Sequence, residues 1–163
     1  IGAVSLALAP GLAGVGGAVF GWGLLLLAVL DVEHLWLPDR ATGLLALLGI
    51  AFGAAGAPPF PNDRLIGMVA GFGSLWLVGR GYRLVRKREG LGGGDPKLFG
   101  AIGGWLGWTG LPYVLVLAGV VGLASVLVSR ARGQTVEATT RLPFGALMAV
   151  VAWPLWLFMY ATN

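Results

Sequence analysis

Long apolar stretches, separated by short polar or proline- and glycine-containing segments, dominate the pattern of this 163-residue chain. We delimit seven of them, at 1–9, 12–30, 41–57, 65–85, 95–108, 111–128 and 142–160. A membrane-spanning helix needs roughly 20 apolar residues; the first stretch is too short to span, and the fifth is short at about 21 Å of helix. We therefore expect an all-α polytopic membrane protein with six transmembrane helices after a helical stub, in one domain over residues 1–163. Because the chain opens inside an apolar stretch, we expect an N-terminal part to precede Ile1.

The composition is that of a membrane protein. Hydrophobic residues make up 57% of the chain and charged residues 11%, whereas a soluble domain carries about 25% charged residues. The many glycines fit this class, because small residues let membrane helices approach closely. We expect such helix contacts at Gly67 and Gly71, Gly103 and Gly107, and Ala118 and Gly122. The chain has no cysteine, which excludes disulfides, thiolate metal ligands and a cysteine nucleophile within it.

The net charge of +4 reflects membrane topology rather than nucleic-acid binding. If the apolar stretches are helices, the segments between them alternate sides, and ten of the eleven basic residues fall on one side. They are Arg40, Arg80, Arg83, Arg86, Lys87, Arg88, Lys97, Arg130, Arg132 and Arg141. By the positive-inside rule that side is cytoplasmic, so Arg64 and the C-terminus are expected on the outer side.

Two aspartates stand at expected helix ends on the cytoplasmic side. Asp31 follows an apolar run at a helix C-terminus, where the helix dipole disfavours a negative charge. The alternative is an ordinary interfacial loop residue. Asp95 follows three glycines and precedes Pro96, so it could simply cap the next helix. That alternative leaves the glycines unexplained, and glycines allow a tight turn or the close approach of another chain.

The polar residues around Asp39 give weaker signals. Asp39 follows a proline and precedes an apolar stretch, which favours a helix N-cap. Glu33 and His34 lie in the same expected loop, and His34 is the only histidine. With no cysteine and no second histidine, we expect no zinc site.

The two aspartates suit acid–base chemistry as a pair. One carboxylate would be charged, to take a proton from water, and the other protonated, to donate to a carbonyl. Two carboxylates a few ångströms apart cannot both ionise cheaply, so a shared proton leaves at a raised pKa.

Four segments resemble motifs of the prepilin leader peptidase family. Asp31–Asp39 resembles the family's first-aspartate motif, D-x-x-x-x-x-[IL]-P-D, and Gly92–Leu98 resembles the second, G-x-G-D-x-K-[LF]. Ala101–Trp108 resembles an A-x-x-G-x-x-x-G-W stretch, and Leu142–Gly145 resembles the I-P-F-G opening of the last helix. The four occur in family order, which is far more specific than a lone G-x-G-D.

The resemblance implies an aspartic peptidase of the bacterial inner membrane with the GxGD fold. Such enzymes cut the short basic leader from type IV prepilins and type II secretion pseudopilins, after a glycine at the cytoplasmic face. The catalytic roles fall on Asp31 and Asp95. Supporting roles fall on the matching positions, Gly92, Gly94, Lys97 and Asp39, with Glu33 added as a candidate contact for the leader.

Larger family members carry a four-cysteine zinc-binding region and also methylate the new N-terminus with S-adenosylmethionine. This chain lacks that region, so we expect no cofactor within it, and S-adenosylmethionine only if a methyltransferase region is present. The same catalytic chemistry would suit a related archaeal preflagellin peptidase, which is therefore an alternative, although the last-helix motif favours the bacterial branch.

The expected partners are a prepilin or pseudopilin and membrane lipids. The basic leader would meet Glu33, Asp39 or Glu89, and the otherwise basic face suits anionic head groups. The main alternative is a transporter or channel with Asp31 and Asp95 as proton or cation carriers, which would place them near the membrane midplane. A catalytically inactive assembly scaffold is the second alternative.

Overall fold

The computed structural model describes residues 1–9, 11–87, 91–132 and 143–161 of the chain. These residues form helices without any strand. The helices are α1 Gly2–Leu8, α2 Leu12–His34, α3 Asp39–Ala54, α4 Pro61–Arg86, α5 Asp95–Ala131 and α6 Phe144–Ala161. By length and apolar composition, α2 and α5 could each cross a membrane, and α6 contains a shorter apolar helix. The prediction of an all-α chain is confirmed.

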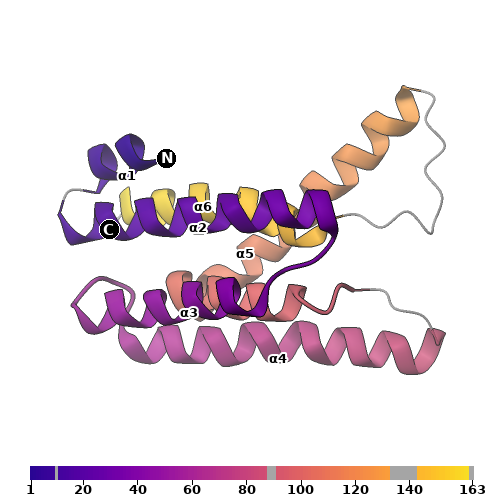
Figure 1. Ribbon diagram of the computed structural model, residues 1–163, viewed down its shortest axis with the longest axis horizontal. Helices are drawn as coiled ribbons and strands as arrows, with labels where there is room; N and C mark the ends of the chain where they lie inside the picture. Colours follow the sequence, from indigo (N-terminus) through magenta and orange to yellow (C-terminus); the bar gives the residue numbers. More distant parts are fainter. Residues whose placement is uncertain (10, 88–90, 133–142, 162–163) are drawn as a thin grey trace.

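The expected helices 95–108 and 111–128 correspond to the two halves of α5. Gly107 separates them with φ 70° and ψ 179°, a backbone conformation that favours glycine. Figure 1 shows the chain reversing direction at this break. The turn lies against the start of α4, where the Trp108 Nε1 atom donates a hydrogen bond to Asp63 at 3.1 Å.

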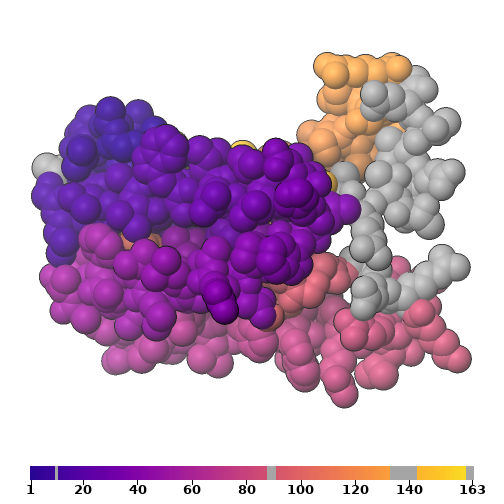
Figure 2. Space-filling model, viewed as in Figure 1, coloured from indigo at the N-terminus to yellow at the C-terminus, as the bar shows by residue number. Residues whose placement is uncertain are grey.

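The helix ends alternate between the two ends of the bundle. In Figure 1, α2 and α4 run towards the right, and α3, the first half of α5 and α6 run back towards the left. Both chain termini lie on the left. Figure 2 shows α2 and α3 covering one face of the molecule, while the end of α5 projects from the body. The described basic residues other than Arg64 therefore belong to helix ends or loops at the right-hand end.

Glycines bring α4 and α5 into close contact, as the sequence predicts. A Cβ on Gly67 would lie 2.5 Å from the Gly103 carbonyl oxygen, and one on Gly71 would lie 2.7 Å from the Phe99 carbonyl oxygen. At the contact of α5 with α6, a Cβ on Gly122 would meet Leu147 at 3.0 Å. At Gly67 and Gly71 backbone atoms occupy the space of a Cβ, so a larger residue would force the helices apart, whereas at Gly122 the obstacle is the end of the Leu147 side chain.

An indole ring connects three helices in the core. The Trp105 ring stacks on Phe20 of α2, with ring centroids 4.9 Å apart. Its Nε1 atom donates a hydrogen bond to the Leu45 carbonyl oxygen of α3 at 2.8 Å. Trp105 itself belongs to the first half of α5, so this residue fixes the position of the helix that begins with Asp95.

Arg64 is fully buried, in contrast to the exposed loop charge that the sequence suggests. It lies in the first turns of α4, which begins at Pro61, earlier than expected. Its guanidinium donates five hydrogen bonds to backbone carbonyls, of Gly49, Ala57, Pro58, Pro59 and Gly104, at 2.6–3.1 Å. One side chain thus joins α3, the α3–α4 connection and α5 at the end of the bundle opposite the basic residues.

Candidate active site

Asp31 is buried in the last turn of α2, with only 5% of its surface exposed. The sequence led us to expect Asp31 as the first residue of a loop. The structure differs, because α2 continues to His34 and ends at Leu35 in a left-handed conformation. The Asp31 Oδ2 atom accepts a hydrogen bond from the Ala146 amide at 2.8 Å. This amide lies in the first turn of α6, so the N-terminus of one helix stabilises a carboxylate that the C-terminus of another disfavours.

Pro143 and Gly145 explain how α6 reaches Asp31. The Pro143 carbonyl accepts the first helical hydrogen bond, from Leu147, which leaves the earlier amides without helical partners. A Cβ on Gly145 would lie 2.8 Å from the Asp31 Oδ2 atom and 3.0 Å from Leu37. Sequence reasoning identified this segment as a family landmark but gave its backbone no role. Leu142 of the same landmark lies outside the described residues.

Asp95 is the first residue of α5 and is also 5% exposed. Its Oδ2 atom accepts a hydrogen bond from the Gly92 amide at 3.0 Å, and a Cβ on Gly92 would meet the same oxygen at 3.0 Å. Gly94 occupies the cap position of α5, which has no side-chain cap. The interpretation of Asp95 as a helix cap is therefore wrong: its carboxylate binds back to the glycine loop.

The two carboxylates line one cavity of about 310 Å³. Its other lining residues come from the α2–α3 connection, the glycine loop and the starts of α3 and α5: Leu35, Trp36, Leu37, Asp39, Gly92, Gly93, Gly94 and Lys97. Asp31 and Asp95 are near enough to interact electrostatically. Residues 64 positions apart in the sequence thus meet at one end of the bundle.

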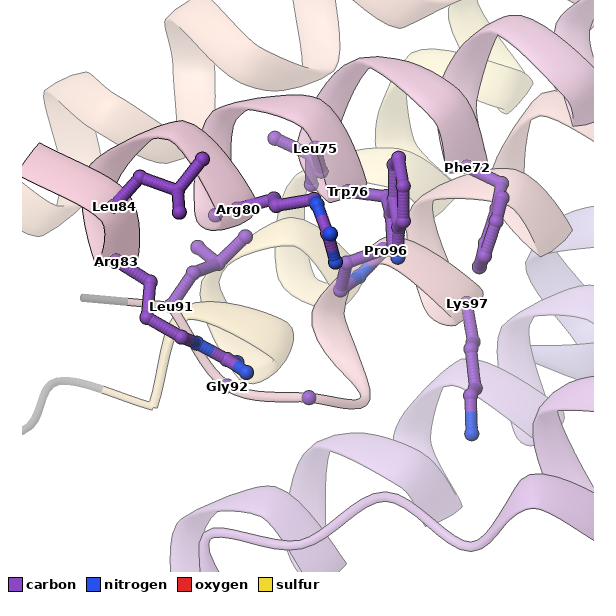
Figure 3. A pocket seen from close by; sticks show the side chains of 12 residues that line it. Phe72, Leu75, Trp76, Arg80, Arg83, Leu84, Leu91, Gly92, Pro96 and Lys97 are labelled. Carbon is purple, nitrogen blue, oxygen red and sulfur yellow. The ribbon is translucent and has the colours of Figure 1, made fainter. Parts of the chain in front are cut away.

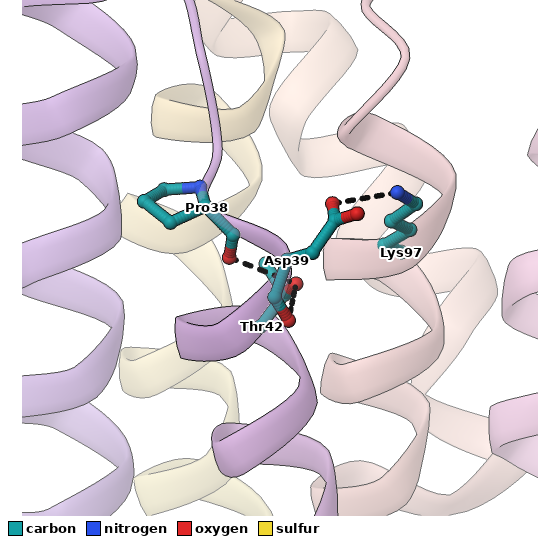
Figure 4. Close-up of polar contacts among 4 residues, drawn as sticks. All are labelled: Pro38, Asp39, Thr42 and Lys97. Atoms are coloured by element: carbon teal, nitrogen blue, oxygen red, sulfur yellow. Dashed lines mark hydrogen bonds and ion pairs between the residues drawn. The ribbon is translucent and has the colours of Figure 1, made fainter.

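Asp39 and Lys97 form an ion pair on the rim of this cavity. The Lys97 Nζ atom lies 2.6 Å from the Asp39 Oδ1 atom, and both side chains are exposed (Figure 4). Pro38 caps α3, so the prediction of Asp39 as the N-cap is wrong. The Thr42 hydroxyl lies within hydrogen-bond distance of the carbonyl oxygens of Pro38 and Asp39, at 3.2 and 3.1 Å. The ion pair joins α3 to α5 directly beside the two buried carboxylates.

The remaining candidates lie apart from the cavity or against its wall. Glu33 and His34 are exposed, with 3.9 Å between Oε2 and Nε2, and neither lines the cavity. A Cβ on Gly94 would meet Leu37 at 2.7 Å, so this glycine lets the loop pack against the α2–α3 connection. Glu89 lies outside the described residues. Within the described ranges, no three His, Cys, Asp or Glu side chains gather as metal ligands would.

The fold and the site together define a helical, apolar protein that carries a buried pair of carboxylates at the basic end of its bundle. Comparison with known proteins gives the family. The model of the type IV leader peptidase family matches residues 18–127, which is more than half of the chain. The chain belongs to this family.

Three relatives that match along most of the chain carry the name "Prepilin leader peptidase/N-methyltransferase". The protein from Escherichia coli (strain K12) is 39% identical over 150 residues, 91% of this chain and 66% of the relative. The proteins from Stutzerimonas stutzeri and Aeromonas hydrophila are 39% and 34% identical, over 81% and 93% of this chain. The chain spans about half the length of these two relatives, 45% and 52%. No solved structure matches.

Proposed function

We propose that the chain is an intramembrane aspartic endopeptidase whose catalytic pair is Asp31 and Asp95. One observation carries the proposal: two buried carboxylates line one cavity, and each accepts a backbone amide hydrogen bond. Burying two carboxylates costs free energy, so their presence at membrane helix ends points to a functional role. Family membership supports the assignment, because the relatives are named as peptidases.

In the proposed reaction the two carboxylates share one proton. The ionised carboxylate takes a proton from a water molecule, and the oxygen of that water attacks the scissile carbonyl carbon. The protonated carboxylate donates its proton to the carbonyl oxygen, which gives a gem-diol. As the gem-diol collapses, one hydroxyl gives its proton to the carboxylate that is now ionised, the C–N bond breaks, and the leaving amine takes a proton from the other carboxyl group. The pair then again shares one proton. The roles are assigned to the pair, since coupled groups titrate together.

The backbone around the pair would hold both carboxylates in place without blocking the substrate. The Ala146 amide fixes Asp31 and the Gly92 amide fixes Asp95. Because Gly92, Gly93 and Gly94 carry no side chains, an extended peptide could lie across this loop and place its carbonyl at the carboxylates. The Lys97–Asp39 pair would keep α3 and α5 at a fixed separation on the rim.

For the membrane arrangement we propose six spans in the GxGD fold: α2, α3, α4, the two halves of α5, and α6. The end that carries Asp31 and Asp95 would face the cytoplasm of a bacterial inner membrane, and the C-terminus would lie outside. The alternation of helix directions supports this arrangement, together with the clustering of basic residues at one end (Figure 1). Both carboxylates lie at helix ends, which disfavours the alternative of a transporter with carriers near the midplane.

The proposed substrate is a prepilin or pseudopilin with a short basic leader, cut after a glycine. The names of the relatives support this substrate class. Among the expected leader contacts, Asp39 is on the rim and already pairs with Lys97, while Glu33 is exposed on the neighbouring helix end. We assign methyl transfer from S-adenosylmethionine to no residue of this chain.

The test is cleavage of a purified prepilin by the purified full chain in lipid vesicles. Wild-type protein should shorten the prepilin by its leader, and Asp31→Asn and Asp95→Asn should each leave it intact while folding normally. Asp63→Asn is the matched control, because Asp63 lies on α4 beside Trp108 and away from the cavity. Cleavage at the wild-type rate by either of the first two variants would rule out the assignment.

A further inference from the structure

A second hollow lies beside the active site, between α4 and the loop that leads to α5. We call it the α4 groove; its volume is about 400 Å³. Its lining consists of Phe72, Leu75, Trp76, Gly79, Arg80, Arg83, Leu84, Leu91, Gly92, Gly93, Pro96 and Lys97. Only the two glycines and Lys97 also line the cavity of Asp31 and Asp95, so the other nine described lining residues have no part in the proposed chemistry.

The polarity of the α4 groove changes along the helix. Phe72, Leu75 and Trp76 form its apolar part, and Arg80 and Arg83 follow one and two turns later, towards the basic end of the bundle. Figure 3 shows the Arg80 side chain lying alongside Trp76 and the Arg83 side chain reaching towards Gly92. Among the described residues of the lining, three are basic and none is acidic.

The cationic end of the groove is built onto an aromatic ring. The Arg80 guanidinium carbon lies 5.4 Å from the centre of the Trp76 ring, a cation–π distance that orients the guanidinium. Trp76 is 45% exposed and Phe72 is 41% exposed, so the apolar part of the groove opens outwards from the bundle. The third base, Lys97, is engaged by Asp39.

We propose that the α4 groove binds an anionic phospholipid. The phosphate would lie at Arg80 and Arg83, and an acyl chain would run along Trp76, Leu75 and Phe72. Charge complementarity favours this occupant, because the lining residues that the structure describes are cationic and include no carboxylate. From Phe72 to Arg83 the helix rises roughly 16 Å, which is about the thickness of one hydrocarbon leaflet. The order of apolar and cationic residues matches the order of a lipid's tail and head.

Lipid occupancy would bear on the active site through the glycine loop. Gly92 and Gly93 line both the groove and the cavity, and the Gly92 amide is the hydrogen-bond donor to Asp95. The inference rests on the membrane location given under the proposed function, but not on the catalytic pair. Its test is therefore a binding measurement, which an inactive peptidase would pass or fail equally well.

The experiment places the full chain in phosphatidylcholine nanodiscs that contain a small equal fraction of either brominated phosphatidylglycerol or brominated phosphatidylcholine. Bromine quenches nearby indole fluorescence, and the difference between wild type and Trp76→Phe isolates the signal of Trp76. We expect brominated phosphatidylglycerol to quench this signal several-fold more strongly. In Arg80→Gln/Arg83→Gln the two brominated lipids should quench this signal about equally, because each of the two lost bases favours the anionic head group by about fivefold.

Arg130→Gln/Arg132→Gln is the matched control, because it removes two charges from the end of α5, outside the groove. This variant should keep the wild-type preference. An undiminished preference in Arg80→Gln/Arg83→Gln, or an equal loss in the control, would overturn the proposal. A prepilin peptide that abolishes quenching by competing for Trp76 would also overturn it, because the groove would then be a peptide site.

Discussion

Gly145→Ala isolates the contact that places Asp31. The added Cβ would lie 2.8 Å from the Asp31 Oδ2 atom, 3.1 Å from its Cγ atom and 3.0 Å from Leu37. Ordinary contacts of this kind are 3.4–4 Å, so the carboxylate must move by roughly half an ångström or more. That movement would lengthen or break its 2.8 Å hydrogen bond from Ala146.

The expected cost is mainly catalytic. A misplacement of about 1 Å at a reacting group costs on the order of a hundredfold in rate, so we expect prepilin cleavage to fall by between tenfold and a hundredfold. The lost amide bond to a charged group would cost about 1.5–3 kcal/mol of stability. The assay follows initial rates of cleavage at saturating prepilin, beside thermal unfolding of the same preparation.

Gly119→Ala and Gly43→Ala are the controls, because a Cβ at either position would meet no atom within 4 Å. Both should cleave at the wild-type rate. If Gly145→Ala also cleaves at that rate while remaining folded, Asp31 does not depend on the N-terminus of α6, and the proposed positioning is wrong.

Three further predictions concern the scaffold. Arg64→Met removes the donor to five backbone carbonyls, three of which it bonds in buried surroundings, those of Gly49, Ala57 and Gly104. Each buried carbonyl that finds no other partner costs about 1–3 kcal/mol, so thermal unfolding in detergent should occur well below the wild-type temperature; an unchanged midpoint would contradict a structural role for these hydrogen bonds. Gly67→Ala should separate α4 from α5 and lower the midpoint, whereas Gly73→Ala on the same helix, with no atom within 4 Å, should not; equal midpoints would refute the close contact. Lys97→Met removes an exposed ion pair with Asp39 and should change stability by less than about 1 kcal/mol while slowing cleavage, so a large loss of stability with normal cleavage would reverse the assigned role.

Much of the helical framework could be predicted from the apolar stretches. The sequence places helices close to α2, α3, α4 and α6, and it predicts the break in α5 within a few residues of Gly107. The close approach of Gly67 to α5 is also predictable from the spacing of small residues. These features depend on local composition and periodicity, which a single sequence displays directly.

The helix ends near the site were less predictable. The sequence suggests that a loop begins at Asp31, because Glu33 and His34 are polar, whereas α2 continues through them. Exposed polar residues are compatible with a last helical turn, so polarity alone does not mark the end. The helix ends at Leu35 in a left-handed conformation, which leucine rarely adopts. A leucine is therefore not a sequence signal for the end of a helix.

The long-range contacts could not be predicted at all. The Ala146 amide binds a carboxylate 115 positions earlier in the chain, and a backbone donor has no signature in the sequence. Arg64 looks like a solitary outer-loop charge, yet its partners are carbonyls from separate segments. Both contacts depend on how helices pack after they form, so only the structure displays them.

The central claim is that Asp31 and Asp95 act as one catalytic unit, and a double-mutant cycle tests it most directly. The values of kcat/KM for prepilin cleavage are measured for wild type, Asp31→Asn, Asp95→Asn and the double variant, all in the same vesicles. Residues that act as a unit are strongly non-additive, so each single variant should lose as much activity as the double variant. Losses that multiply independently in the double variant, or a single variant with substantial activity, would contradict a shared-proton pair.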